Sequence, residues 1–293
     1  MSRLQGLRSY QTVLKNYLYN LSYQILALLL PIITVPYITR VFSQDLVGLN
    51  TVTQANCSYF VLIGMLGISY LGPREIAKCL GNKEKVRETF SSIYKIQWIA
   101  HAIALLTYIL FCMVNGGSMV AYVYILYILF SMTDISWFFI GIEQFKSISV
   151  RNMLAKLISF ALLIALIKRE EDIYLYICTL YVPQILMNLY MWLLKHRNYG
   201  ANIRTGGIDK RYVKEAISLF IPLVSSSIYT ILDKSILGIF TTYGAVAIYS
   251  QGTTLLRVAM TIVPSFCSVM VPRISICFAN HDEESTLKYM KFS

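Results

Sequence analysis

The chain has 293 residues, of which 56% are apolar and 14% are charged, and its formal net charge is +11. Soluble domains carry about 25% charged residues, so this composition excludes an ordinary water-soluble fold. The positive charges lie in short gaps between long apolar blocks, where membrane topology signals lie, and this position argues against nucleic-acid binding.

Eight apolar segments are long enough to cross a bilayer, which takes about 20 residues. Their expected limits are 16–39, 50–72, 92–114, 119–141, 150–167, 173–194, 216–240 and 245–271. The fifth is the weakest, because Arg151 and Lys156 occupy its first turns and would have to snorkel to the inner interface. A ninth span is expected to begin at Leu287. The sequence therefore predicts an all-α polytopic membrane protein.

Basic residues alternate between the two sides of these spans. With the N-terminus in the cytoplasm, 20 Lys and Arg residues fall on inner segments and 3 on outer segments. Because basic loops stay in the cytoplasm, this asymmetry predicts an N-in orientation. The outer loops 115–118 and 241–244 are too short for a receptor domain or a large enzyme.

The longest inner loop, about 195–215, combines three glycines with six basic residues and indicates a linker between two bundles. We therefore expect an N-terminal six-helix bundle over 1–197, a cytoplasmic linker over 198–214, and the start of a second bundle over 215–293. The second bundle would be incomplete, with two spans and the beginning of a third.

An internal repeat links the two predicted bundles. Phe42 ends one span and Pro73 closes the next, and Phe240 and Pro272 do the same at nearly the same spacing. Six expected spans separate the two copies, so both begin on the cytoplasmic side. Parallel repeats of this kind are typical of transporters in which two bundles rock about a central site.

Ionisable residues deep in the spans are the candidate substrate-binding groups, because a charge at mid-bilayer costs about 2.5–3.5 kcal/mol and is usually functional. Arg257 and Lys234 predict a cationic, water-filled cavity for an anionic cargo, since the guanidinium fork matches phosphate. Internal pairing is the alternative, of Asp134 with Lys95 or of Asp233 with Arg257. The full candidate set is Arg257, Lys234, Asp233, Arg40 at the outer mouth, Lys95 and Asp134.

No cofactor, metal or catalytic site is expected. The six cysteines form no CxxC pair, the three histidines show no metal-ligand spacing, and no GxxxxGK[ST] motif for ATP is present. The cysteines are expected to be small residues within the core.

Four groups of residues carry a family resemblance. They are PYITRVF (36–42) with Gly48; GPREIA (72–77) with Asn82 and Lys83; WFFIGIEQFK (137–146) with Arg151 and Asn152; and LDKSILG (232–238) with AIYS (247–250). In order and spacing they resemble the Wzx-type polysaccharide flippases, in the polysaccharide transporter branch of the MOP exporter superfamily. The resemblance covers nearly the whole chain, although that family typically has twelve or more spans.

The resemblance implies a two-bundle fold like that of multidrug exporters, and a place in a bacterial inner membrane. It implies translocation of an undecaprenyl-pyrophosphate-linked oligosaccharide for O-antigen or capsule assembly. The implied partners are that carrier lipid, membrane lipids, a polysaccharide polymerase, a chain-length regulator and a coupling ion, H⁺ or Na⁺. An ion-coupled drug exporter is the main alternative; a membrane glycosyltransferase and a non-transporting scaffold also stay open.

Overall fold

A computed structural model of the chain describes residues 2–200, 207–257 and 260, with side chains from Ser22 onward apart from 228–230. Within these ranges the chain is helical, with short turns and no strand. The elements are α1 Ser2–Val41, α2 Gln44–Met65, α3 Ile68–Lys78, α4 Lys83–Val114, α5 Met119–Val123, α6 Ile125–Thr133, α7 Ser136–Gly141, α8 Phe145–Leu166, the 3-10 turn η1 Glu170–Asp172, α9 Ile173–Tyr199 and α10 Lys210–Phe240. Residues 243–257 form a further helix.

Six helical segments of the described chain are long and apolar enough to cross a membrane, and α10 makes seven if its two halves count as one span. Those halves, Lys210–Ser227 and Ile231–Phe240, are inclined by 52° to each other. The all-α polytopic prediction is confirmed, and these segments correspond to the first seven expected spans. Residues 258–259 and 261–271 of the eighth, and the expected start at Leu287, lie outside the described residues.

Two of the spans are interrupted, which the sequence did not predict. Between α2 and α3, Leu66 and Gly67 both adopt left-handed backbone angles, with φ of 45° and 74°. Between α6 and α7, the helix stops at Asp134 and Ile135. Interrupted helices are tolerated at membrane depth only where protein or a cavity satisfies the freed backbone groups, so both breaks are candidate functional sites.

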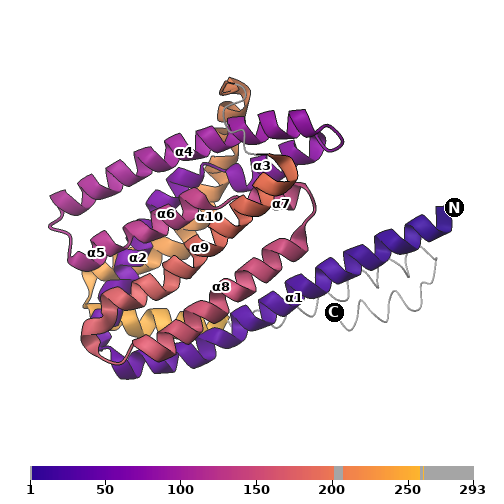
Figure 1. Cartoon of the computed structure of the whole chain (residues 1–293). Coiled ribbons are helices and arrows are strands. Elements are labelled where there is room, and N and C mark those ends of the chain that lie inside the picture. Colours follow the sequence, from indigo (N-terminus) through magenta and orange to yellow (C-terminus); the bar gives the residue numbers. More distant parts are fainter. Residues whose placement is uncertain (1, 201–206, 258–259, 261–293) are drawn as a thin grey trace, which may run out of the picture.

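The helices pack side by side as a bundle (Figure 1). The closest partnerships are α8 with α9, α2 with α4, α1 with α8 and α3 with α7, while α10 lies against α2 and α3. On the outer face of α4, Ile99, Ile103, Leu106 and Leu110 are exposed at helical spacing. Such a stripe is suited to lipid contact.

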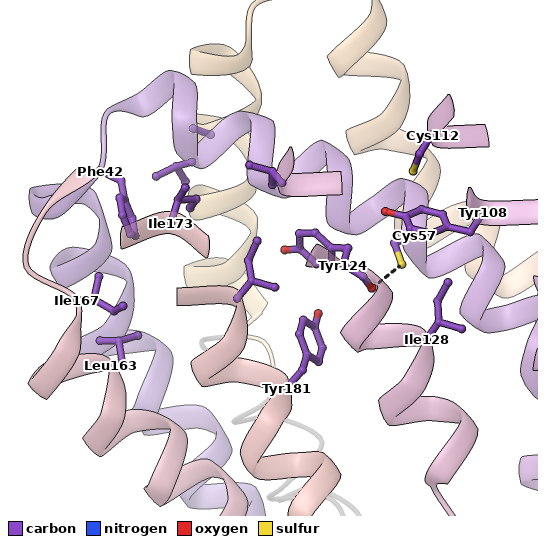
Figure 2. Close-up of a cluster of buried hydrophobic side chains, with 14 residues drawn as sticks. Phe42, Cys57, Tyr108, Cys112, Tyr124, Ile128, Leu163, Ile167, Ile173 and Tyr181 are labelled. Carbon is purple, nitrogen blue, oxygen red and sulfur yellow. Dashed lines mark hydrogen bonds between the residues drawn. The ribbon is translucent and has the colours of Figure 1, made fainter. Parts of the chain in front are cut away.

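Two buried clusters hold the bundle together. One, near the predicted outer loops, is shown in Figure 2 and includes Phe42, Tyr124 and Tyr181. The other, near the predicted inner loops, stacks Phe90 on Trp137 with ring centroids 5.3 Å apart. In the first cluster the Cys57 thiol donates to the Tyr124 carbonyl at 3.5 Å. Cys57 and Cys112 are buried core residues, Cys79 and Cys178 are half-buried, and all four are free thiols; Cys267 and Cys277 lie outside the described residues.

Candidate functional site

Two contacts join α2 to the helix 243–257 at the spacing of the expected repeat. The Gly244 amide donates to the Asp45 carboxylate at 2.9 Å, and the Thr51 and Ser250 hydroxyls lie 3.4 Å apart. Both pairs are separated by 199 residues, the same offset that relates Pro73 to Pro272 in the repeat. Contacts between equivalent positions are what a two-fold axis between the copies produces. We call this contact between α2 and the helix 243–257 the repeat junction.

Close backbone approach at the junction depends on a glycine. A Cβ atom on Gly48 would lie 1.7 Å from the Tyr243 carbonyl oxygen, so no larger residue fits without separating the two helices. On the next turns, Asn56 accepts a hydrogen bond from the Ser235 hydroxyl of α10 at 3.0 Å. The junction is therefore close-packed and partly polar.

A cavity of about 140 Å³ lies beside the junction, between α1, α2, α9 and the helix 243–257. Phe42 and Tyr176 contribute aromatic surface, but most of the polar lining consists of amides and hydroxyls. These neutral polar groups come from Asn50, Thr51, Gln54, Ser250, Gln251 and Thr254. Amides and hydroxyls both donate and accept hydrogen bonds, so the cavity is suited to a ligand rich in hydroxyl groups.

Two buried tyrosines fix the amides of this cavity. The Tyr124 hydroxyl donates to Asn50 Oδ1 at 2.9 Å, and Gln54 Nε2 donates to the Tyr181 hydroxyl at 3.1 Å. Because Tyr124 and Tyr181 belong to the core cluster of Figure 2, the amides are held by rigid elements. The sequence analysis missed these groups, since an uncharged Asn or Gln in a span gives no charge signal.

One of the candidate charged residues, Arg257, follows the cavity lining along its helix. Ser250, Thr254 and Arg257 follow at intervals of four and three residues, so they share one face of their helix. Arg257 is therefore about one turn beyond the cavity lining. It is close enough to Lys234 for their charges to interact, as is Asp233.

Asp233 also has a neutral partner, because the Tyr249 hydroxyl donates to its Oδ2 at 2.8 Å. Arg40 lies exposed in the last turn of α1, between Ile38 and Phe42, which line the cavity, but Arg40 itself is not part of the lining.

The remaining two candidates, Lys95 and Asp134, lie on other elements of the described chain. Lys95 lines a different, larger cavity between α4 and α9. Asp134 forms its ion pair with Arg151, with Nη1 and Oδ1 3.2 Å apart, and not with Lys95, the partner that the sequence analysis considered. Its carboxylate also accepts from the Ser136 amide at 2.8 Å, at the break between α6 and α7.

Arg151 does not snorkel to the interface as expected. Its side chain is buried, with the whole residue 7% exposed, and it donates to Asn188 Oδ1 and to Asn152 Oδ1. Asn188 in turn donates to the Phe130 carbonyl at 2.9 Å. The reason is that the face of α8 carrying Arg151 meets two acceptors on neighbouring helices, Asp134 and Asn188, which compensate a buried charge better than a long reach to water would.

A second polar side chain, that of Gln97, forms hydrogen bonds at the break in the fourth span. Gln97 Nε2 donates to the Asp134 carbonyl at 2.9 Å, and its Oε1 accepts from the Trp137 indole at 2.8 Å. His101 Nε2 lies 2.9 Å from the Ser131 hydroxyl. The backbone groups freed by the break are thus satisfied by protein, and among the described residues no cluster of His, Cys, Asp and Glu could hold a metal ion.

Fold and site together define a multi-pass membrane protein with a polar cavity where two internal repeats meet. Residues 13–278 match the model of a family described as "Polysaccharide biosynthesis protein". The chain belongs to this family, in agreement with the resemblance to polysaccharide flippases. No solved structure matches the chain.

Two relatives carry the name "Putative O-antigen transporter". The protein from Shigella dysenteriae is 23% identical over 252 residues, which cover 84% of this chain and 63% of the relative. The protein from Escherichia coli strain K12 is 24% identical over 149 residues, which cover 50% of this chain and 36% of the relative. The matched part of the chain spans less than two thirds of the length of either relative.

Proposed function

We propose that the chain translocates lipid-linked oligosaccharide repeat units across the bacterial inner membrane, with the sugar in the cavity beside the repeat junction. The observation that carries this proposal is the neutral polar lining, in which Asn50, Gln54 and Gln251 offer amides to sugar hydroxyls. A drug exporter would favour a cavity that attracts lipophilic cations, and amides and hydroxyls supply no such charge.

The lipid phosphate would bind one turn beyond the sugar. Arg257 follows the cavity-lining Thr254 on the same helix face. Its guanidinium carries a fork of N–H donors that matches the oxygens of a pyrophosphate. The undecaprenyl-pyrophosphate cargo, with an anion at one end and hydroxyls along the rest, has matching chemistry.

Orientation and energy input follow from the charges and the membrane fold. The excess of basic residues on one side supports a cytoplasmic N-terminus. The tight repeat junction provides a pivot about which two bundles could alternate their access. A gradient of H⁺ or Na⁺ would supply the energy, and the polymerase and chain-length regulator of polysaccharide assembly would consume the product.

Single-residue variants, made in the native gene in its own host, test the proposal. Gln54→Leu should abolish or strongly reduce surface polysaccharide and cause the lipid-linked repeat unit to accumulate. The matched control is Thr107→Ala, which alters an exposed hydroxyl of α4 that bonds only to its own helix backbone. Normal polysaccharide in Gln54→Leu, or altered drug susceptibility without a polysaccharide defect, would contradict the proposal.

A further inference from the structure

A cavity larger than the one beside the repeat junction lies on the side of the bundle formed by α4 and α9. It has a volume of about 620 Å³, within the range of about 300–1,000 Å³ of small-molecule sites. Its lining is apolar and aromatic apart from one cation, Lys95, and the hydroxyl-bearing Thr133. Those residues include Lys95, Trp98, Ile99, Leu189, Trp192 and Ile208. We call it the lateral groove.

The walls of the lateral groove are preformed. The Trp98 indole donates to the Tyr94 hydroxyl at 2.8 Å, and the Trp192 indole donates to the Thr133 carbonyl at 3.0 Å. The rings of Tyr94 and Trp192 meet edge to face with centroids 4.6 Å apart. Because both indole N–H groups are already bonded within the protein, the walls offer hydrocarbon and ring surfaces to an occupant.

The depth of Lys95 places its charge at the edge of the hydrocarbon. α4 has 32 residues, about 48 Å at 1.5 Å per residue, whereas the hydrocarbon core is about 30 Å thick. About 20 residues cross that core, and the last 20 residues of α4 begin at Lys95. Lys95 therefore lies at headgroup level when the outer end of α4 lies at the opposite boundary.

We propose that the lateral groove binds an acyl chain of an anionic glycerophospholipid of the cytoplasmic leaflet, with Lys95 against the lipid phosphate. The apolar lining fits a hydrocarbon chain, and the single cation, Lys95, fits an anion. The groove is lined by residues of α4, α6 and α9 and by Ile208, which lies just before α10. None of these residues lines the junction cavity, so a bilayer lipid can reach the groove without passing the proposed cargo site. This inference goes beyond the proposed function and does not depend on the identity of the cargo.

The native tryptophans report directly on the groove. The chain has three, of which Trp98 and Trp192 line the groove and Trp137 is buried in the core. The protein would be reconstituted with lipids carrying brominated acyl chains, which quench nearby indoles on contact. Brominated phosphatidylglycerol should quench more strongly than brominated phosphatidylcholine at equal mole fraction.

Substitution of Lys95 tests the phosphate contact. One basic residue near the membrane surface contributes about 1 kcal/mol, so Lys95→Gln should lower the preference for phosphatidylglycerol about fivefold. Lys85→Gln, which removes the same charge from the first turns of α4, should leave the preference unchanged. Lys95→Arg should retain the preference for phosphatidylglycerol. If Lys95→Gln does not fold, high salt tests the same contact, because it should remove the preference in the unmodified protein.

Two results would overturn the proposal. Equal quenching by both headgroups in the unmodified protein would mean ordinary annular lipid and no site. Displacement of brominated phosphatidylglycerol by an equimolar polyprenyl phosphate, but not by an equimolar unbrominated phosphatidylglycerol, would mean that the groove belongs to the carrier lipid instead.

Discussion

Gly48→Ala probes whether the repeat junction is as tight as the structure shows. The new Cβ would lie 1.7 Å from the Tyr243 carbonyl oxygen, while real Cβ contacts stay beyond 3.0 Å, so the two helices must move apart. The hydrogen bond from Gly244 to Asp45, now 2.9 Å, would then be stretched beyond bonding distance. The contact of Thr51 with Ser250 would be lost as well.

The expected loss of stability follows from these contacts. Two hydrogen bonds contribute about 0.5–1.5 kcal/mol each, and overpacking costs about 1–3 kcal/mol. Alanine gains about 0.5–1 kcal/mol over glycine within a helix, so the net loss should be about 1–5 kcal/mol.

Thermal unfolding in detergent measures the change in stability, and hydrogen–deuterium exchange over 241–246 should accelerate. The control is Gly252→Ala, on the helix opposite α2, where a Cβ meets nothing within 4 Å and stability should not fall. If Gly48→Ala unfolds at the same temperature as the unmodified chain and exchanges at the same rate, the junction described here is wrong.

Three further predictions concern the breaks and the charged groups. Arg151→Met should cost about 1–3 kcal/mol, because the half-buried Asp134 carboxylate loses its ion pair and keeps its bond from the Ser136 amide. Adding Asp134→Asn should recover much of that loss. Thermal unfolding measures both, and the exposed Arg211→Met is expected to be silent. Gly67→Ala should cost about 1–3 kcal/mol, since it adds left-handed backbone strain and a Cβ 2.7 Å from the Ala216 carbonyl oxygen. Gly81→Ala adds the same kind of strain without crowding, so it should lower the melting temperature less. Arg257→Gln should reduce surface polysaccharide in the native host more than Arg257→Lys, and equal, normal levels in both would remove Arg257 from the cargo site.

The spans could be predicted from the sequence because the length of an apolar block is set by the bilayer. The hairpin at 115–118 illustrates this, since α4 ends at Val114 and α5 begins at Met119. The breaks could not be predicted in the same way. Leu66 takes a positive φ, which a leucine does not favour, and the neighbouring Gly67 lies against α10, a segment distant in the sequence. Such a conformation is decided by tertiary packing.

Charge was an incomplete guide to the candidate site. It singled out Arg257, Lys234 and Asp233, whose part in cargo binding stays a prediction. For Arg151 the charge pattern gave the wrong position. A sequence does not distinguish an arginine that reaches the interface from one that is paired inside the protein, and the internal partner Asn188 lies on another helix. The charge pattern also missed the cavity amides, because neutral polar residues in a span carry no charge and leave its overall apolar character intact.

Site-directed photocross-linking in the native host tests the central claim most directly. A photoreactive amino acid would replace Thr254, in the cavity lining, or Leu110, on the exposed face of α4, and cells would be labelled with radioactive sugar. The account predicts that lipid-linked oligosaccharide attaches at position 254 and not at position 110. Attachment at 110 with none at 254 would contradict a cargo site beside the repeat junction.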